Sequence, residues 1–443
     1  MPEYNRKILK SGAVKKNSHY PLSGREHRHH YGKFAGSMLS ATARTYRNAY
    51  SGLSRSTWLL SFVMLINRSG TMVVPFMTLY LTSPEMGYSI SQAGFVFGLF
   101  GAGAFSGAWL GGRMTDKFGF YPVQLITLLG GGILFIVLGQ MKSYSLICIF
   151  TFAVSFVNEA FRPANSTAIA FYSKEENRTR SYALNRLAIN IGWALGVAMG
   201  GLIADYNYEL LFWVDGFTNI GAALVMWLFL KPVDYKPAHH KVIAGKPQIS
   251  AYRDNVYLVF IVVTMLFAAC FFQIFTNLPV YFRKELHFSE SYIGLVMSIN
   301  GIIIALVEMV LVYKMESKGK NGLLITVGVA LVGISFLMLN LPGMGALLAF
   351  CMILVVTFGE IFSMPFMNTY WISRTQPSNR GEYAALYTMA WSAAQCLGPM
   401  LGAQIADHSG FRSLWWMVGG LALVASFCFF RILRERKSIA SQV

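Results

Sequence analysis

Stretches without any charged residue recur along this chain of 443 residues. Two of them lie between Glu85 and Arg113 and between Asp254 and Arg283. An ionised side chain at the centre of a bilayer costs several kcal/mol, and a spanning helix needs about 20 apolar residues. The pattern therefore predicts an all-α membrane protein with twelve transmembrane helices, at roughly 56–82, 90–112, 122–140, 144–171, 182–204, 209–230, 255–282, 290–313, 322–340, 344–372, 383–406 and 412–431.

Composition supports this prediction. Hydrophobic residues make up 55% of the chain and charged residues only 13%, whereas about a quarter of the residues in a soluble domain are charged. A soluble globular protein is therefore excluded. The 5 cysteines all fall in predicted helices without a CxxC pair, which favours a packing role over disulfide bonds.

The positive charge marks one side of the membrane. The chain carries 37 Lys and Arg against 20 Asp and Glu, a formal net charge of +17. If the N-terminus is cytoplasmic, 30 of the 37 basic residues lie in cytoplasmic segments, and the outer loops hold only Lys142, Arg283, Lys284 and Arg412. The positive-inside rule therefore predicts that both termini are cytoplasmic. Charge distributed in this way gives no basis for nucleic-acid binding.

The second half of the chain repeats the pattern of the first. A shift of 200 residues places Ser89, Ser91, Gly94 and Gly101 on Ser289, Ser291, Gly294 and Gly301, and a shift of 202 places Pro163, Gly196 and Asp205 on Pro365, Gly398 and Asp407. We therefore predict two six-helix halves at 55–230 and 255–433, a cytoplasmic linker at 231–254, a basic and mostly disordered arm at 1–54, and a tail at 434–443. Parallel repeats of this kind occur in secondary transporters, where two halves rock around a site at the midplane.

A loop motif follows the second predicted helix. It reads Gly112-Arg113-Met114-Thr115-Asp116-Lys117-Phe118-Gly119, and a degenerate copy, Met315-Glu316-Ser317-Lys318-Gly319, occupies the matching place in the second half. The motif closely resembles the signature loop of the major facilitator superfamily, and the resemblance covers residues 55–433.

The resemblance implies the fold of that family and a gating role for the loop. Asp116 would accept a hydrogen bond from the N-terminus of a neighbouring helix and latch the outward-closed arrangement, together with Gly112, Arg113, Lys117 and Gly119. The alternative is that these residues only form a tight turn. The resemblance also implies a multi-pass carrier in a bacterial inner membrane, monomeric, in contact with lipids and a small-molecule substrate, and without a cofactor or metal.

Drug/proton antiporters are the members that the chain is most similar to, with two departures. Gly192, Gly196, Gly200 and Gly201 keep the glycine spacing of their fifth helix, but Val197 stands where they carry proline. The arginine expected in helix four, about a dozen residues before the proline, is also missing, because that region reads Ile149-Phe150-Thr151.

Ionisable residues inside predicted helices are the first candidates for a site, because they are costly there. In this fold helices one, four, seven and ten line the cavity, so Asn67 and Arg68 of helix one are expected beside Glu159 and Arg162 of helix four. Glu159 and Arg162 share a helix face. The alternative is a buried pair that only locks two helices together.

Glu360, in helix ten near the repeat position of Glu159, has no Lys or Arg within a dozen residues. We therefore expect Glu360 to take up a proton more readily than Glu159, and predict Glu360 as the proton carrier, with Glu308 and Glu159 as further proton-coupling candidates. The predicted solute contacts, besides Asn67, Arg68 and Arg162, are Arg186, Asn190, Gln273, Asn277, Asn300, Tyr370, Trp371, Trp391 and Gln395.

Three classes of function compete. A secondary active transporter of a small organic solute, with proton-coupled efflux, is favoured by the repeat, the loop motif and the buried acids. Proton-coupled uptake of a peptide, sugar or metabolite remains the alternative within transporters, and a sensor that keeps the fold without transport remains open. An enzyme is not expected, since the sequence contains no HExxH or GxSxG motif, and an ATP-driven pump would need a GxxxxGK[ST] loop.

Overall fold

The computed structural model describes residues 52–174, 177–232, 250–316, 321–343, 345–375 and 380–440. Most of the predicted arm and linker, and the last three residues of the predicted tail, lie outside this described part. Its helices are α2 (Arg55–Ser69), α3 (Val73–Leu81), α4 (Ile90–Phe118), α5 (Phe120–Gly139), α6 (Tyr144–Tyr172), α7 (Arg178–Tyr206), α8 (Glu209–Phe229), η2 (Ala251–Arg253), α9 (Asn255–Phe271), η3 (Phe272–Phe275), α10 (Asn277–Lys284), α11 (Glu290–Glu316), α12 (Asn321–Met338), α13 (Gly345–Ser373) and α14 (Arg380–Ala440).

Among these described residues, 11 helical segments are long and apolar enough to cross a membrane. The last of them, Glu382–Leu433, has 52 residues, more than twice the length of one span. Within α14 the backbone turns at Gly410 (φ 79°, ψ 163°), where two helices meet. The count of twelve spans stays a prediction, and the turn at Gly410 supports it.

The first helix of each predicted half is broken. The span Arg55–Leu81 consists of α2 and α3, which are separated at Gly70–Met72, and the span Asn255–Lys284 consists of α9, the short η3 and α10. The sequence predicts one continuous helix in each place. Polar residues near each break, such as Ser69 and Gln273, do not by themselves distinguish a break from a continuous helix that faces a cavity, and the contacts that hold each break reach to other helices.

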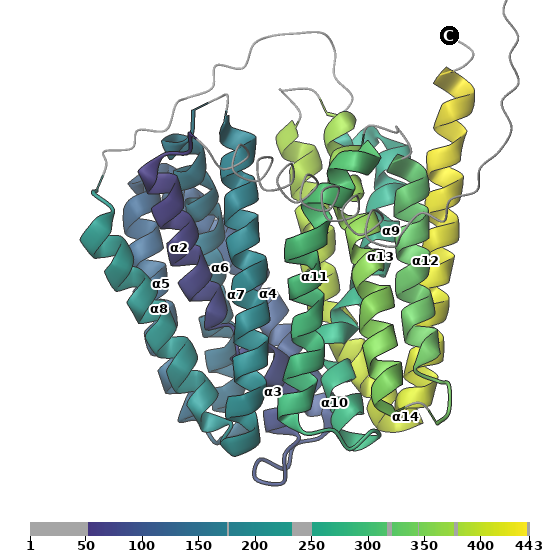
Figure 1. The fold of residues 1–443 in the computed structure, drawn as a ribbon, viewed down its shortest axis with the longest axis horizontal. Coiled ribbons are helices and arrows are strands. Elements are labelled where there is room, and N and C mark those ends of the chain that lie inside the picture. The colour runs from purple at the N-terminus through teal and green to yellow at the C-terminus, as the bar shows by residue number, and fades with distance from the viewer. Residues whose placement is uncertain are drawn as a thin grey trace, which may run out of the picture. The chain divides into compact units, whose positions relative to one another are not determined.

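The helices pack in two sets, which we call the first set (α2–α8) and the second set (α9–α14). Within the first set α4 packs on α6 and α5 on α8, and within the second set α12 packs on α13 and α9 on α14. The two sets meet where α7 lies against α11 and α4 against α14, with α3 against α10 (Figure 1).

Two sides of the bundle are named here by the chain segments at its helix ends. The linker side holds the start of α2, the α4–α5 turn, the end of α8 and the start of α9. The opposite side holds the connections 82–89, 206–209 and 285–289 and the turn at Gly410.

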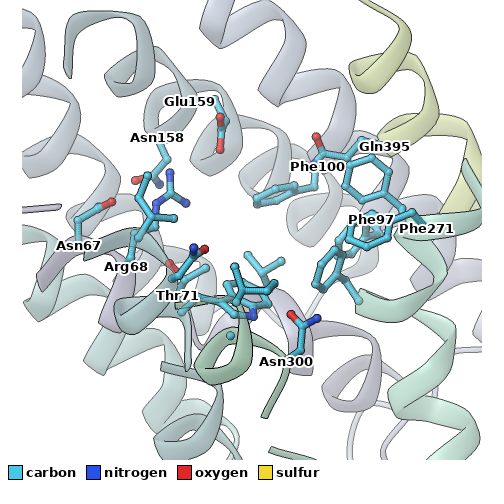
Figure 2. A pocket seen from close by; sticks show the side chains of 18 of the residues that line it. Asn67, Arg68, Thr71, Phe97, Phe100, Asn158, Glu159, Phe271, Asn300 and Gln395 are labelled. Carbon is cyan, nitrogen blue, oxygen red and sulfur yellow. The ribbon is translucent and has the colours of Figure 1, made fainter. Parts of the chain in front are cut away.

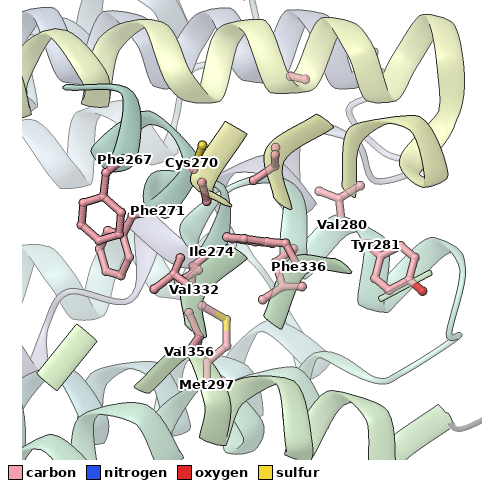
Figure 3. Close-up of a cluster of buried hydrophobic side chains, with 14 of the residues drawn as sticks. Phe267, Cys270, Phe271, Ile274, Val280, Tyr281, Met297, Val332, Phe336 and Val356 are labelled. Carbon is pink, nitrogen blue, oxygen red and sulfur yellow. The ribbon is translucent and has the colours of Figure 1, made fainter. Parts of the chain in front are cut away.

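The core of the second set is built from aromatic and branched side chains. Figure 3 shows Ile274 of η3 beside Val332 of α12, and Phe267 and Phe271 of α9 belong to the same buried cluster as Phe336 of α12. Phe336 and Trp415 stack with ring centroids 5.6 Å apart, and both side chains are fully buried. This packing holds the broken helix firmly against its neighbours.

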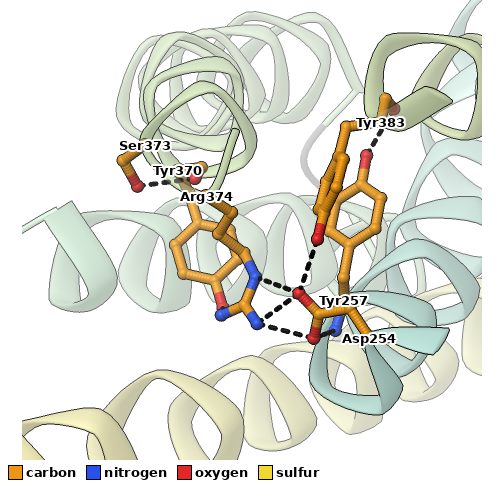
Figure 4. A network of polar contacts seen from close by, with 6 residues as sticks. All are labelled: Asp254, Tyr257, Tyr370, Ser373, Arg374 and Tyr383. Carbon is orange, nitrogen blue, oxygen red and sulfur yellow. Dashed lines mark hydrogen bonds and ion pairs between the residues drawn. The ribbon is translucent and has the colours of Figure 1, made fainter. Parts of the chain in front are cut away.

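A polar network fixes the start of α9 on the linker side (Figure 4). The Asp254 carboxylate accepts from Arg374 Nε at 2.9 Å and from Arg374 Nη2 at 2.5 Å, and from the Tyr383 hydroxyl at 3.0 Å. The Tyr257 hydroxyl donates to the carbonyl of Tyr383 at 2.6 Å. Burial raises the pKa of Asp254, but the hydrogen bonds from Arg374 and the Tyr257 N–H outweigh it and leave that pKa below its usual range.

Candidate functional site

A cavity of about 280 Å³ lies where the two sets of helices meet. It is lined by residues from each helix of the first set, α2 to α8, including Asn219 of α8, and by residues from α9, η3, α11, α13 and α14 of the second set. Of the predicted site residues, Asn67, Arg68, Glu159, Asn190, Asn300, Glu360 and Gln395 line it. Residues that lie more than 300 positions apart in the sequence therefore form one site (Figure 2).

The wall from the first set carries opposite charges. Glu159 pairs with Arg162 three residues later at 3.0 Å, and Glu159 is 12% exposed whereas Arg162 is 67% exposed. Arg68 lies close enough to interact electrostatically with both. Its Nε is buried and has no hydrogen-bond partner among the residues that the structure describes. Arg68 thus brings a positive charge to the cavity wall that the Glu159–Arg162 pair does not satisfy.

The wall from the second set carries Glu360. Its Oε2 accepts from Asn300 Nδ2 at 3.1 Å, and the same Asn300 amide donates to Thr357 Oγ1 at 3.0 Å. Asn300 comes from α11, and Thr357 and Glu360 from α13. No side-chain ion pair with Glu360 is found among the described residues, in contrast to Glu159.

Aromatic rings make up much of the remaining lining. Phe97 and Phe100 of α4 face Phe271 of α9 in Figure 2. Trp193 of α7 meets Phe275 of η3 edge-on, with centroids 5.4 Å apart, so this contact joins the two sets. The apolar helix pattern gives no signal that separates these rings from core or lipid-facing ones, and the sequence analysis did not single them out.

A proline interrupts each of the two helices that carry the cavity carboxylates. Pro163 lies inside α6 and Pro365 inside α13, 202 residues apart in the repeat. A proline has no N–H and therefore removes one helix hydrogen bond to the residue four positions earlier. In α6 that residue is Glu159.

Arg186 and Glu308 form an ion pair between the two sets. Arg186 Nη2 of α7 donates to Glu308 Oε1 of α11. Together with Asn190 and Pro365 they line a second, smaller pocket of about 70 Å³. The sequence predicts Arg186 as a solute contact and Glu308 as a proton-coupling residue, and it gives no sign that the two side chains pair directly.

Other predicted solute contacts lie outside the cavity lining. Gln273 Nε2 donates to the carbonyl of Gly398 at 2.7 Å, and Asn277 Nδ2 donates to Gln273 Oε1 at 2.5 Å, so both amides hold the break in the second set. Tyr370 and Trp371 lie near the linker-side end of α13, where the Tyr370 hydroxyl accepts from Arg374. Trp391 packs edge-on against Phe267.

The sequence predicts a loop at 112–119, but residues 112–118 form the end of α4 and only Gly119 separates α4 from α5. Gly119 has φ +87°, a conformation that favours glycine, and a Cβ at Gly111 would lie 2.5 Å from Ala160 Cα, whereas the space beside Gly112 is open. The close helix approach expected of the motif therefore occurs at Gly111. Arg113 lies over the Trp109 ring at 3.8 Å, and Lys117 lies near the Phe118 ring. Asp116 is exposed, and its gating role stays a prediction.

The two sets are in close contact on the opposite side. A Cβ at Gly201 of α7 would lie 2.9 Å from Gly294 Cα of α11. The Ser291 hydroxyl donates to Asp205 Oδ2 at 2.7 Å, and the Ser91 N–H donates to Asp407 Oδ2 at 3.3 Å. These two hydrogen bonds are related by the internal repeat.

Two similar sets of helices, a broken helix in each and a cavity between the sets are typical of secondary transporters. Comparison with known proteins agrees. The model of the Major Facilitator Superfamily matches residues 57–399 and 370–442. The chain belongs to the major facilitator superfamily and is a multi-pass integral membrane protein.

Individual relatives are distant but cover nearly the whole chain. A Na(+), Li(+), K(+)/H(+) antiporter of Planococcus maritimus is 22% identical, over 85% of this chain and 95% of that protein. The multidrug resistance protein MdtH of Aeromonas salmonicida is 23% identical, over 81% and 90%. A solved POT family transporter in complex with a thioalcohol-conjugated peptide has a TM-score of 0.71 at 13% identity, covering 87% of this chain and 97% of that one, a likeness of fold.

Proposed function

We propose that the chain is a secondary active transporter that moves a small organic solute by alternating access, with proton-coupled efflux. The observation that carries the proposal is the cavity shared by both sets, which places Arg68 and Glu159 on one wall and Glu360 on the other. A site between two halves is reached from either face of the membrane as the halves rock.

The orientation follows from the positive-inside rule. With both termini in the cytoplasm, the linker side faces the cytoplasm and the opposite side faces outward. The contacts of Gly201 with Gly294 and of Asp205 with Ser291 then close the outer side. The structure would represent a state closed to the outside.

Glu360 is proposed as the proton carrier. Its side chain lines the cavity, its neighbour Asn300 is neutral, and no cation pairs with it among the described residues. A carboxylate in these surroundings can be neutralised by a proton, whereas Glu159 is already paired with Arg162. Glu308 is paired with Arg186, and Glu159 and Glu308 remain secondary proton candidates.

The solute is proposed to be amphipathic. Arg68, Asn67 and Asn190 offer a charge and hydrogen bonds, while Phe97, Phe271 and the other rings offer apolar faces. Efflux is supported by the relatives named for multidrug resistance and for cation/proton antiport. We further propose that the protein acts as a monomer.

The test uses purified protein in liposomes with an imposed pH gradient and an entrapped pH-sensitive dye. A panel of a fluorescent lipophilic cation, a labelled dipeptide and a labelled nucleoside is offered to the wild type, to Glu360→Gln, and to Glu85→Gln, which alters a carboxylate in an exposed loop. We expect uphill movement of one solute class by the wild type and by Glu85→Gln, and its loss in Glu360→Gln. Uphill transport by Glu360→Gln at the wild-type rate would overturn the assignment of the proton carrier.

Direction is tested separately in everted membrane vesicles. Under efflux, adding the transported solute releases protons from acidified vesicles, and the dye signal recovers. Proton entry together with the solute in right-side-out vesicles would instead establish uptake. If no member of the panel moves on any gradient although the protein binds one of them, the transporter assignment is wrong and a sensor is favoured.

A further inference from the structure

Asp215 in α8 is fully buried and lies outside the cavity lining. Met72 N–H donates to its Oδ1 at 2.9 Å and to its Oδ2 at 3.1 Å, and Val73 N–H donates to Oδ2 at 2.9 Å. These two N–H groups stand at the start of α3, beyond the break in the first span.

These hydrogen bonds provide acceptors for the first N–H groups of α3. The first N–H groups of a helix have no partner within that helix, and in a membrane no water is at hand to satisfy them. Met72, at the position before α3, provides no side-chain cap. The carboxylate supplies the missing acceptors, and the partial positive charge of the helix start offsets its burial.

The next turn of α8 also contacts the break and the end of α2. Thr218 lies so close to Gly70 that a Cβ there would be 1.7 Å from Thr218 Oγ1. Asn219 Nδ2 donates to the backbone carbonyl of Asp215, and Asn219 Oδ1 accepts from Asn67 Nδ2 at 2.8 Å. These residues are three and four positions apart and therefore share one face of α8.

This face of α8 sets the direction of the cavity residues. Asn67 and Arg68 form the last turn of α2, directly before Gly70, and both line the cavity. The backbone of α8 is itself held tightly, since a Cβ at Gly216 would lie 2.8 Å from the Gly132 carbonyl of α5. α8 is thus packed closely against α5 while it contacts the break, and its Asn219 also lines the cavity.

In the described part of the second set, uncharged groups hold the break. Its break is held by the amides of Gln273 and Asn277 and by the carbonyl of Gly398. The position 202 residues after Asp215 is Met417. A carboxylate behind the broken helix is therefore a property of the first set and is not imposed by the repeat.

We propose that Asp215 is a positioning residue, which caps α3 at the break and thereby directs Arg68 into the cavity. Asn219 assists by its hydrogen bond to Asn67. The proposal rests on the proposed function only in taking Arg68 as a contact of the solute. The geometry itself can be tested without any transport.

The test measures the rate at which an aqueous, positively charged methanethiosulfonate reagent labels a single cysteine in the full chain, with the five native cysteines replaced. One reporter is Arg68→Cys on α2, and the other is Asn300→Cys on the facing wall from α11. Each is combined with Asp215→Asn. The matched control is Glu209→Gln, which neutralises a half-exposed carboxylate at the start of the same helix.

We expect Asp215→Asn to lower the labelling rate at position 68 about tenfold. Losing a hydrogen bond to a charged group reduces by about this factor the population in which position 68 points into the cavity. The rate at position 300 should stay within about twofold, and Glu209→Gln should change neither. A merely structural role, or a shift between the states of the carrier, would change both reporters together.

Unchanged labelling at position 68, or an equal fall at both positions, would overturn the proposal. If Asp215→Asn does not yield monodisperse protein, Asn219→Ala tests the same contact with the carboxylate retained. We then expect a smaller fall at position 68 alone, and no fall there would overturn the proposal equally. Since no solute or gradient is used, a failure here is distinct from a failure of the transport assignment.

Discussion

Replacing Gly201 by alanine should open the carrier on the opposite side. At Gly201 an added Cβ would lie 2.6 Å from the Glu290 carbonyl oxygen and 2.9 Å from Gly294 Cα. The second distance is roughly 0.5 Å short of an ordinary carbon contact. Both obstacles are backbone atoms of α11, so no side chain can rotate away. Gly201→Ala therefore has to push α7 and α11 apart.

The expected magnitude follows from the cost of overpacking. An extra methyl group in a tightly packed contact costs about 1–3 kcal/mol. It destabilises only the conformation in which the opposite side is closed, because α7 and α11 touch at Gly201 only in that conformation. A difference of this size shifts the ratio of two conformations roughly 5- to 150-fold. Gly201→Ala should thus raise the population in which the opposite side is open.

The assay is a distance distribution between two spin labels on the opposite side. Exposed positions suit it, and Tyr206 in the first set and Ser409 in the second are both exposed. Gly221→Ala is the matched control, because Gly221 lies in α8 with nothing within 4 Å of an added Cβ. We expect a longer-distance population in Gly201→Ala and none beyond the wild type in Gly221→Ala. Equal distributions in the two variants would refute the reasoning.

Two further predictions concern ion pairs. Arg186→Gln or Glu308→Gln should slow transport several-fold, because the ion pair joins the two sets. Exchanging the two charges should restore part of the transport rate. A coupling energy below about 0.5 kcal/mol in a double-mutant cycle would contradict this. Asp254→Asn should lower the free energy of unfolding by about 1.5–3 kcal/mol near neutral pH. The folded-state pKa of Asp254 is depressed, so its contribution is present above the unfolded-state pKa of about 3.9 and is lost as the pH falls through the folded value. Thermal unfolding of both proteins from pH 3 to pH 8 checks this, and a difference that persists undiminished at the acid end would contradict it.

The spans could be predicted from the sequence because the membrane imposes a coarse rule. The helix expected at 209–230 is observed as Glu209–Phe229, and the one expected at 144–171 as Tyr144–Tyr172. Hydropathy over about 20 residues is enough for this. The breaks at Gly70 and at Phe272–Phe275 were not predicted, since a break in a membrane helix depends on partners such as Asp215 and the Gly398 carbonyl, which lie far from it in the sequence.

The candidate site could be predicted in part for a similar reason. Arg68, Glu159 and Glu360 are conspicuous as charges in apolar helices, and all three line the cavity. Neutral amides carry no such signal. Asn300 and Gln273 were both predicted as solute contacts, but Asn300 lines the cavity whereas Gln273 holds the backbone. Only the three-dimensional packing tells these two amides apart.

The prolines of α6 and α13 have a mechanical consequence. Each removes a helix hydrogen bond at the level of a cavity carboxylate, and the two lie at the same position of the repeat. A helix bends most readily where such a bond is missing. Each set therefore has one position where its helix bends most easily, and the two positions match in the repeat. Strain applied at the cavity is expected to bend α6 and α13 at these prolines before it deforms the rest of either helix.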